Sequence, residues 1–295
     1  MKIMIIGKGS MSTRRQNFLK TARHEFITYD ITDNITCREV MDKYKPDGMI
    51  ISCPPTTKQQ YITLANKHGL KPFCEADIVD YQGDYFPSCS LRFHDGINKI
   101  KELLKNETIG KIYTFQYRLG QHIRDWRPKG FDFTNYYAAK HGGPEMVIFE
   151  LGWLSYLFGT PQKSCGMTDR KMNDTQISSN DVFAMAVQFP VCIGSILVDV
   201  FSRPATRSLT VIGSNGTLLW NWDNSYITID FADGTRTTEG YDKGTAAEGY
   251  HAAICEDMYE NEIRNFIEAI QGKAEYLYSR EEEKACINML RKVEV

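Results

Sequence analysis

An alternation of short apolar runs with helical segments, up to Glu75, constrains the fold of this 295-residue chain more than any other feature. The apolar runs predict buried strands at Lys2–Ile6, Phe26–Tyr29, Gly48–Ser52 and Pro72–Glu75. The segments between them predict helices over Thr13–Arg23, up to about Tyr44 and from Thr56 onward. Strands and helices that alternate in this way form a parallel sheet with right-handed crossovers. The sequence therefore predicts a doubly wound α/β domain.

Two local signals predict where helices of this domain begin and end. Thr36 and Glu39 have the spacing of a capping box, in which each side chain bonds the other residue's backbone N–H group. Gly69 can take the left-handed conformation that closes a helix. Pro54 and Pro55 stop the strand before Thr56.

Beyond about residue 120 the pattern changes from alternating strands and helices to successive strands. Strand-like runs follow one another at Val182–Phe189, Gly194–Phe201, Ser208–Ile212, Gly216–Trp222 and Tyr226–Phe231. We expect a first domain over residues 1–120 and a second, α+β domain over residues 121–295 with an open, mainly antiparallel sheet. An apolar stripe predicts a late helix that can pack back on the first domain, through Ile263, Phe266, Ile267 and Ile270.

Composition excludes several classes of partner and site. The 35 Lys and Arg residues balance 37 Asp and Glu residues, so no overall field would hold nucleic acid or an anionic membrane. No apolar run approaches the ~18 residues that span a bilayer, and Met1 leads directly into a strand, so we expect a cytoplasmic protein. The eight cysteines lack C-x-x-C pairs and zinc-ligand spacing, which predicts reduced thiols and no metal site.

The first strand leads into a glycine turn of the kind that binds dinucleotides. Gly7 and Gly9 fill the first two places of G-x-G-x-x-G, and Ser12 stands in the third as a small residue. The helix that follows would aim its free backbone N–H groups at a pyrophosphate, and Ser10 and Met11 in the turn before it are candidate cofactor residues. An ordinary tight turn is the alternative. The turn favours a Rossmann domain, the nucleotide-binding form of the doubly wound fold.

Asp30 supports the dinucleotide interpretation and a choice of cofactor. It closes the second strand, where a carboxylate accepts hydrogen bonds from the adenosine ribose and repels a 2′-phosphate. We therefore predict NAD as the cofactor, with NADP as the alternative. Arg14 and Arg15 could reverse this choice, although we expect both to lie on the solvated surface of the helix.

Motifs spread over nearly the whole chain resemble the glucose-fructose oxidoreductase and inositol dehydrogenase family (Gfo/Idh/MocA). Ser52-Cys53-Pro54 and Glu75 resemble segments that lie against its cofactor, and Ser90–His94 resembles its N-x-R-F segment. Gly120–Pro128 and Ser202–Ser208, the latter leading into Val211–Leu218, resemble the branch that acts on nucleotide-linked sugars in polysaccharide synthesis. The resemblance implies a small-molecule sugar substrate and a homodimer or homotetramer.

The chain departs from this family at both usual catalytic positions. The family lysine of Glu-Lys-Pro is absent, because the segment here is Glu75-Ala76-Asp77. The family histidine is also absent from the helix after Gly142-Gly143. We consider Glu150, His141 and Tyr137 as replacement catalytic residues, along with Lys140 in the same segment. Their structural alternatives are a helix cap or structural ion pair for Glu150, loop surface for His141 and packing for Tyr137.

Four further residues are candidate substrate ligands. An arginine fork beside an aromatic ring can hold a diphosphate or a sugar, which favours Trp126 and Arg127. Arg92 comes from the N-x-R-F-like segment, and Trp153 lies on the helix after the glycine pair. For Trp126 and Arg127 the alternative is a folded loop with a surface ion pair. For Trp153 the alternative is core packing.

Three functions fit these observations. The leading prediction is an NAD(P)-dependent oxidoreductase that moves hydride to or from a sugar or nucleotide-sugar hydroxyl or carbonyl. The second is a dinucleotide-binding, catalytically degenerate protein with a regulatory or scaffolding role. The third is cofactor-assisted elimination or epimerisation. The open sheet also predicts face-to-face assembly, which a monomer in light scattering would contradict.

Overall fold

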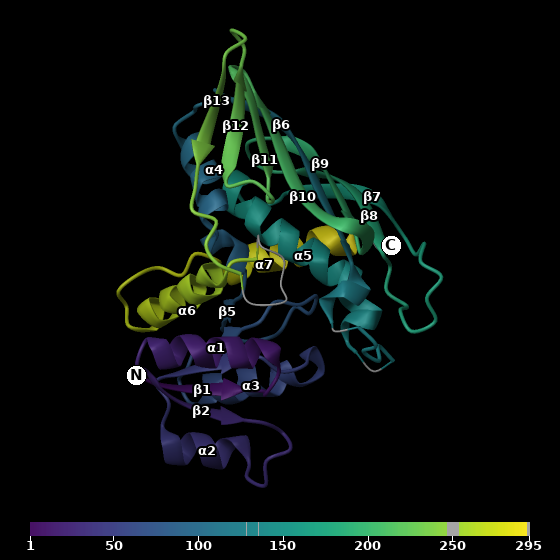
Figure 1. Ribbon diagram of the computed structural model, residues 1–295. Helices are drawn as coiled ribbons and strands as arrows, with labels where there is room; N and C mark the ends of the chain where they lie inside the picture. The colour runs from purple at the N-terminus through teal and green to yellow at the C-terminus, as the bar shows by residue number, and fades with distance from the viewer. Residues whose placement is uncertain (128, 135, 247–253, 294–295) are drawn as a thin grey trace. The chain divides into compact units, whose positions relative to one another are not determined.

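The computed structural model describes residues 1–127, 129–134, 136–246 and 254–293 (Figure 1). Contacts between residues divide the chain into two units. The first comprises Met1–Phe93 and Asp257–Glu281, and the second comprises His94–Glu256 and Glu282–Val295. The domain boundary near residue 120 stays a prediction. None of the described helices is long and apolar enough to cross a membrane.

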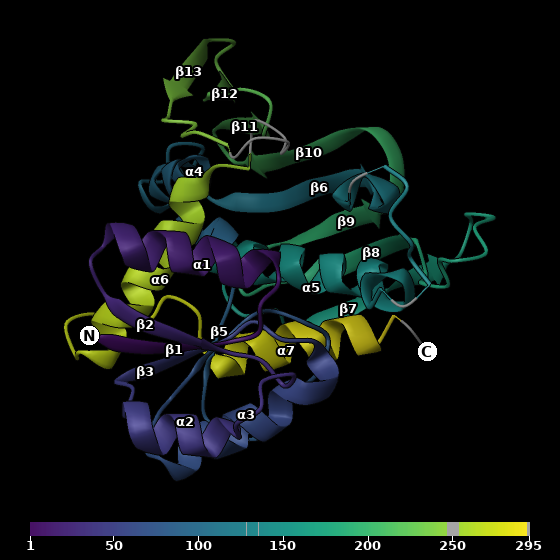
Figure 2. The same ribbon diagram turned by 60° about the horizontal axis from the view of Figure 1, so that its bottom comes forward.

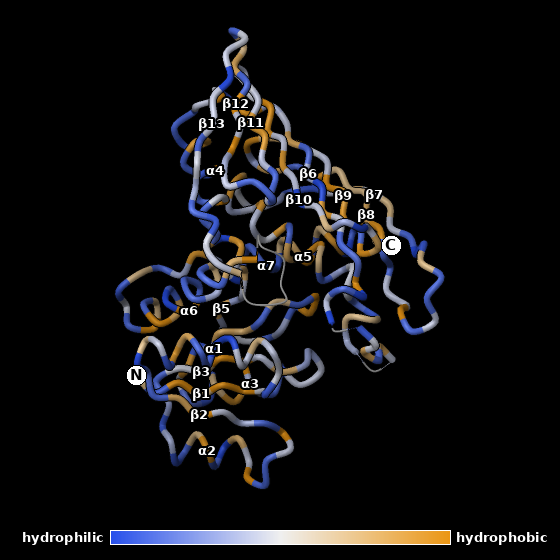
Figure 3. The backbone as a smooth tube through the Cα atoms, viewed as in Figure 1, coloured by the Kyte–Doolittle hydropathy of each residue, from blue (hydrophilic) through white to orange (hydrophobic). Residues whose placement is uncertain are grey.

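The first unit contains a parallel sheet in the order β2-β1-β3-β4-β5. Its strands are β1 (Lys2–Ile6), β2 (Glu25–Tyr29), β3 (Gly48–Ile51), β4 (Phe73–Cys74) and β5 (Phe86–Pro87). Its helices are α1 (Ser10–Thr21), α2 (Cys37–Tyr44), α3 (Pro55–Lys67) and nearly all of α6 (Glu256–Ile270). The predicted Rossmann-like sheet is therefore confirmed, and Figure 3 shows the hydrophobic colour of its central strands.

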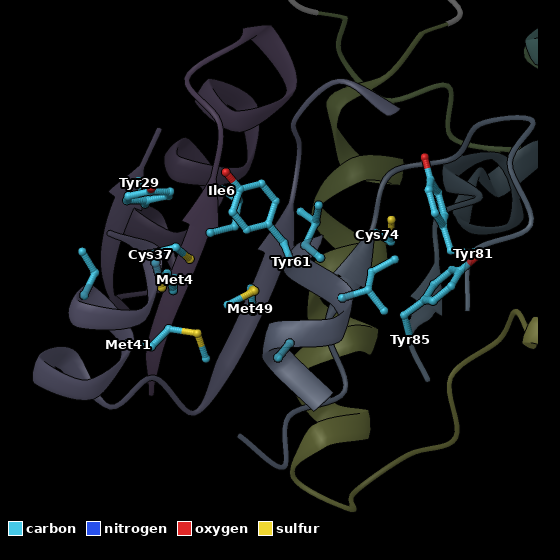
Figure 4. Close-up of a cluster of buried hydrophobic side chains, with 14 residues drawn as sticks. Met4, Ile6, Tyr29, Cys37, Met41, Met49, Tyr61, Cys74, Tyr81 and Tyr85 are labelled. Carbon is cyan, nitrogen blue, oxygen red and sulfur yellow. The ribbon is translucent and has the colours of Figure 1, made fainter. Parts of the chain in front are cut away.

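Helices cover both faces of this sheet. In β1, Ile3 and Ile5 pack with apolar residues of α1 and α6, whereas Met4 and Ile6 pack with residues of α2 and α3. Figure 2 shows α1 on one side of the sheet with α2 and α3 on the other, and Figure 4 shows the second cluster. Each buried side chain of this size contributes about 1.5–3 kcal/mol, so the alternation in β1 anchors the sheet from both sides.

Two predicted signals for helix ends in the first unit are confirmed, although α1 spans Ser10–Thr21 and not the predicted Thr13–Arg23. The Thr36 hydroxyl accepts from the Glu39 backbone N–H at 3.2 Å, and the Glu39 carboxylate accepts from the Thr36 N–H at 2.8 Å. Gly69 takes a φ of +72° beyond the end of α3. All eight cysteines are free thiols in the structure.

The second unit contains an eight-stranded sheet in the order β13-β12-β11-β10-β6-β9-β8-β7. Neighbouring strands are antiparallel except for β6 and β9, which confirms the predicted open, mainly antiparallel sheet. The strands are β6 (Ile112–His122), β7 (Lys163–Asp169), β8 (Val182–Gln188), β9 (Ile193–Asp199), β10 (Phe201–Gly213), β11 (Gly216–Asn221), β12 (Tyr226–Phe231) and β13 (Arg236–Gly240). Its helices are α4 (Asp95–Lys105), α5 (Ala138–Phe158) and nearly all of α7 (Arg280–Arg291), with a 3-10 turn at η2 (Ile123–Trp126). A further 3-10 turn, η1 (Ser90–Phe93), belongs to the first unit.

One face of this sheet is exposed and partly apolar. In β8 and β9, Phe183, Val187 and Val198 are buried, while alternate residues such as Ile193 and Leu197 face solvent. Met167 of β7 is 77% exposed. A partly apolar open face is compatible with the predicted assembly of identical chains, which stays a prediction.

Candidate functional site

Gly7 and Gly9 have different structural reasons to be glycine. Gly7 has a φ of +103°, and a Cβ atom there would lie 2.5 Å from the carbonyl oxygen of Ser52. Only glycine fits that close approach of the turn to the end of β3. A Cβ atom at Gly9 would meet nothing within 4 Å, so the space above its backbone is open. This is the geometry that a turn needs to receive a pyrophosphate.

The N-terminus of α1 follows this open space. Gly9 is its N-cap, and no side chain from the described residues caps it or places an acid in its first turn. The backbone N–H groups at Ser10 and Met11 therefore retain the positive partial charge that favours an anion. Ser12, in the third glycine position, is completely buried and accepts from Gln16 at 3.2 Å. Its small side chain permits close packing of the helix.

The predicted cofactor residues of the first unit lie at the carboxyl ends of adjacent parallel strands. The Gly7 N–H donates to Tyr29 O at 2.7 Å, next to Asp30, and the Ser52 N–H donates to Ile6 O at 2.9 Å. The Ser52 hydroxyl donates to Glu75 Oε1 at 3.3 Å. Ligands of doubly wound sheets bind outside these strand ends, where the order of the strands reverses.

Cys53 and Pro54 continue the β3 end of this region. Pro54 precedes α3, and its carbonyl accepts from the Thr57 N–H at 3.0 Å. Cys53 is partly buried, and burial raises the pKa of its thiol. The thiol is therefore protonated at neutral pH and behaves as a packing group.

Asp30 and its neighbours carry the charge at the end of β2. Asp30 Oδ1 accepts from the backbone N–H of Thr32 at 3.1 Å and from its hydroxyl at 2.9 Å. Lys8, between the two glycines, pairs with Asp33 at 2.5 Å. Lys8, the positive side chain of the glycine turn, therefore has Asp33 as its carboxylate partner.

Arg15 corrects one expectation, because it is buried instead of lying on the helix surface. Its guanidinium bonds Glu75 at 3.0 and 3.2 Å and Glu262 of α6 at 2.6 Å. Burial raises the pKa of Glu262 to about 7, although Arg15 opposes that shift. Arg15 connects the candidate cofactor residue Glu75 to the core of the first unit.

A buried lysine bonds the segment Glu75-Ala76-Asp77, which stands in place of the family's Glu-Lys-Pro. Lys58 of α3 donates to the Glu75 carbonyl and to Asp77, both at 2.6 Å. The Tyr81 hydroxyl donates to the same Asp77 carboxylate at 2.8 Å. These contacts fix the backbone at Ala76, where the family lysine is absent.

Arg92, a candidate substrate ligand, lies in the interior of the first unit. Its guanidinium stacks 4.0 Å from the centre of the Tyr278 ring and donates to the Leu277 carbonyl. The side chain is almost completely buried. These contacts are those of a packing residue, and its substrate role stays a prediction.

Glu150 and Trp153 lie in a buried cluster of the second unit. Glu150 accepts from Trp153 Nε1 at 2.5 Å, from Arg207 Nη2 at 2.7 Å and from the hydroxyl of Tyr117. Burial raises the pKa of Tyr117, and the negative charge of the Glu150 carboxylate adds to this shift. Every contact is one expected of the structural alternative for Glu150, a buried ion pair. The catalytic role of Glu150 and the substrate role of Trp153 stay predictions.

His141 and Tyr137 are adjacent at the start of α5. Their ring centres are 4.5 Å apart and the rings are tilted by 32°. Burial lowers the pKa of His141, and the positive charge of Lys140 adds to this shift. The imidazole is therefore neutral at neutral pH. The glycine pair that follows has a packing reason, because a Cβ atom at Gly143 would lie 2.0 Å from Asn180 O.

Trp126 and Arg127 flank the end of η2. Trp126 packs on Gly142 of α5, where a Cβ atom would lie 3.1 Å from its ring. The Arg127 guanidinium lies 4.7 Å from the centre of the Tyr136 ring. The predicted ion pair of this loop is present, from Arg203 to Asp125 at 2.6 Å. Pro128, the last residue of the motif, lies outside the described residues.

Comparison with known proteins now connects this geometry to a family. Residues 97–219 match the model of the GFO/IDH/MocA C-terminal domain. This match identifies a GFO/IDH/MocA C-terminal domain within the chain. The resemblance inferred from the sequence motifs is thereby confirmed, and the matched residues all fall within the second unit. A comparison with curated protein sequences finds no match.

Solved structures share the fold of the whole chain at low sequence identity. A levoglucosan dehydrogenase in complex with NADH has a TM-score of 0.79 at 12% identity, covering 100% of this chain and 96% of its own. An oxidoreductase from Agrobacterium radiobacter, in complex with NAD+, L-tartaric acid and magnesium, has a TM-score of 0.78 at 12% identity, covering 100% and 95%. An NAD binding oxidoreductase from Klebsiella pneumoniae has a TM-score of 0.78 at 13% identity, covering 100% and 96%. These likenesses establish the fold.

The sequence analysis did not predict that the charged side chains of Arg15, Lys58 and Arg207 are buried. One signal was available for Arg15, which precedes Phe18 and Leu19 at the i+3 and i+4 spacing of an apolar helix face. A charged residue in such a stripe indicates a buried ion pair. A comparable signal was available for Arg207, which alternates with Leu209 and Val211 on the buried face of β10.

Proposed function

We propose that this protein is an NAD(H)-dependent oxidoreductase that moves hydride to or from a carbon of a sugar or nucleotide sugar. The observation that carries the proposal is the glycine turn. Position 7 requires glycine, because a Cβ atom there would lie too close to the carbonyl oxygen of Ser52. Gly9 leaves open space at the N-terminus of α1, which no side chain of the described residues caps. A bound nicotinamide dinucleotide would supply the hydride acceptor or donor. Similar solved structures are described with NAD+ or NADH bound, which supports the same cofactor here.

NAD(H) is preferred over NADP(H) because of the charges near Asp30. Its carboxylate is suited to accept hydrogen bonds from ribose hydroxyls and to repel a 2′-phosphate. Lys8 pairs with Asp33, and the Arg14 guanidinium stacks 4.2 Å from the Tyr259 ring centre. Arg15 bonds Glu75 and Glu262. These contacts engage the basic side chains that could otherwise bind a 2′-phosphate.

His141 is our candidate for the base in alcohol oxidation. In that reaction the hydroxyl gives its proton to a base, the carbon gives up a hydride, and the C–O bond becomes a carbonyl. A neutral imidazole can accept the proton, and the low pKa of His141 keeps it neutral. Tyr137 stacks on the ring and would hold its orientation. Glu150 is less suited, because Arg207, Trp153 and Tyr117 all bond its carboxylate.

The first test is a fluorescence titration with NADH and NADPH. We expect the wild-type protein to bind NADH more tightly than NADPH and Gly9→Asp to lose NADH binding, because the new carboxylate enters the open space at α1. Aspartate is also a good N-cap, so this variant should melt at or above the wild-type temperature. Asp30→Ala should lose the preference for NADH. A wild-type protein that binds neither cofactor would overturn the proposal.

The second test is turnover of sugars and nucleotide sugars by wild type and His141→Asn. Loss of a general base costs typically 10²–10⁴-fold in rate, and NADH affinity should not change. Turnover by the variant at the wild-type rate would remove His141 from the mechanism. NADH binding without turnover of any substrate would instead favour the regulatory or scaffolding alternative.

A further inference from the structure

We propose that Lys58 is a positioning residue for cofactor binding, which holds the main chain of Glu75 where the nicotinamide half of a dinucleotide would lie. The inference rests on the proposed function and adds to it a residue outside the glycine turn and the strand ends. Lys58 belongs to α3 of the first unit, as do both residues that its ammonium group bonds, Glu75 and Asp77. It is not a surface lysine, since only 2% of it is exposed.

The order of the strands puts Glu75 on the side of the sheet opposite to Asp30. The glycine turn follows β1, Asp30 follows β2 on one side of β1, and Glu75 follows β4 on the other side, beyond β3. Neighbouring strands are about 4.8 Å apart, so the three steps from β2 to β4 span about 14 Å. A dinucleotide with its adenosine ribose at Asp30 and its pyrophosphate at the turn therefore extends its second nucleoside toward β3 and β4.

Glu75 is held by two buried cations, one on its side chain and one on its main chain. Arg15 bonds the carboxylate at 3.0 and 3.2 Å, and Lys58 Nζ donates to the carbonyl oxygen at 2.6 Å. The Ser52 hydroxyl also donates to the carboxylate, which keeps 15% of its side chain exposed. Without Lys58 the carbonyl would lose its cation, and the main chain that leads into Ala76 would lose this contact.

Asp77 holds the ammonium group of Lys58 in this position. One of its carboxylate oxygens accepts from Lys58 at 2.6 Å and from the Tyr81 hydroxyl at 2.8 Å, and the other accepts from the Val79 N–H at 2.7 Å. Burial lowers the pKa of Lys58, but the acidic groups around it, Asp77 among them, more than reverse that shift. The lysine is therefore charged at neutral pH, and a charged donor bonds the Glu75 carbonyl more strongly than a neutral one.

Packing alone does not require an ion pair at this place. Replacing both members of a buried pair by uncharged residues is often neutral for stability, whereas removing one member leaves an uncompensated charge. Position 76, where the family lysine is absent, lies between the two residues that Lys58 bonds. A lysine from α3 thus acts on the main chain of the segment that lacks a lysine of its own.

The experiment compares two double variants that remove both charges of the pair. Lys58→Met/Asp77→Asn loses the donor to the Glu75 carbonyl, whereas Lys58→Gln/Asp77→Asn keeps an N–H donor. NADH binding is followed by fluorescence and ADP binding by calorimetry, because ADP has the adenosine and the pyrophosphate but no second nucleoside. We expect the methionine variant to bind NADH about tenfold more weakly than wild type, as for loss of one hydrogen bond to a charged group. It should bind ADP like wild type, and the glutamine variant should recover most of the NADH affinity.

Lys71→Met/Asp84→Asn is the matched control, since Lys71 precedes β4, at the opposite end from Glu75, and pairs with Asp84 at 3.0 Å. It should bind both ligands like wild type, and urea unfolding should show that every variant is folded. Wild-type NADH affinity in the methionine variant, equal losses of NADH and ADP binding, or equal NADH affinities of the two Lys58 variants would overturn the positioning role. These outcomes leave the proposed function intact, whereas a wild-type protein that binds no NADH would overturn both.

Discussion

The two units each contain a buried arginine bonded to glutamate, and the two networks differ in their access to solvent. In the first unit Arg15 joins Glu262 to Glu75, whose side chain is 15% exposed. In the second unit Arg207 bonds Glu150, which is 0% exposed. The first network reaches the strand ends where we place the cofactor, whereas the second is closed by Tyr117 and Trp153.

This difference separates two roles for the same pair of residue types. A network with one solvent-accessible carboxylate, Glu75, can respond to a ligand or exchange a proton with solution, including at its buried member Glu262. A sealed carboxylate whose oxygens all have donors contributes to packing and orientation of the unit. We therefore expect changes at Glu150 to act on stability, and changes in the Arg15 network to act on the response to pH.

The largest expected effect is that of Glu150→Ala. Removing one partner of a buried ion pair leaves an uncompensated charge and costs about 3–5 kcal/mol, here at Arg207. Urea unfolding followed by circular dichroism measures the loss, and Glu150→Gln should lose less because an oxygen acceptor remains. A Glu150→Ala protein as stable as wild type but without turnover would restore Glu150 as a catalytic candidate.

The next effect is a pH dependence that comes from Glu262. Burial raises its pKa from 4.5 to about 7 on folding, so the folded protein binds more protons than the unfolded chain between these values. Its contribution to stability is therefore greatest below pH 4.5 and is lost as the pH rises through 7, by up to about 3 kcal/mol.

Glu262→Gln tests this dependence. Glutamine keeps an acceptor for the Cys89 N–H, which Glu262 accepts at 2.7 Å, but it does not titrate. The free energy of unfolding of wild type should fall relative to Glu262→Gln between pH 4.5 and 7. Parallel pH profiles for the two proteins would contradict a raised pKa at Glu262.

The sequence was sufficient where structure is set by neighbouring residues. The glycine turn, the Thr36 capping box and the apolar strands of the first sheet depend on local conformation and on alternating burial, both visible in one sequence. The polar strands β7 and β13 lack that alternation and were missed. Burial of Arg15, Arg92 and Glu150 depends on which distant segments pack over them, as α6 does over Arg15. No local pattern distinguishes such a residue from one that binds a ligand.

The smallest expected effect is at an exposed ion pair between an arginine and a carboxylate, Arg203 and Asp125. Asp125 and Arg203 make two hydrogen bonds, as Arg15 and Glu75 do, but their side chains are 56% and 55% exposed. The hydrogen bonds from Arg203 lower the pKa of Asp125, yet solvent screens such a pair and stability gains little from it.

We expect Asp125→Asn to unfold at the wild-type urea concentration. Urea unfolding followed by circular dichroism measures the midpoint. A large loss of stability in this variant would mean that exposure to solvent does not rank the three arginine pairs.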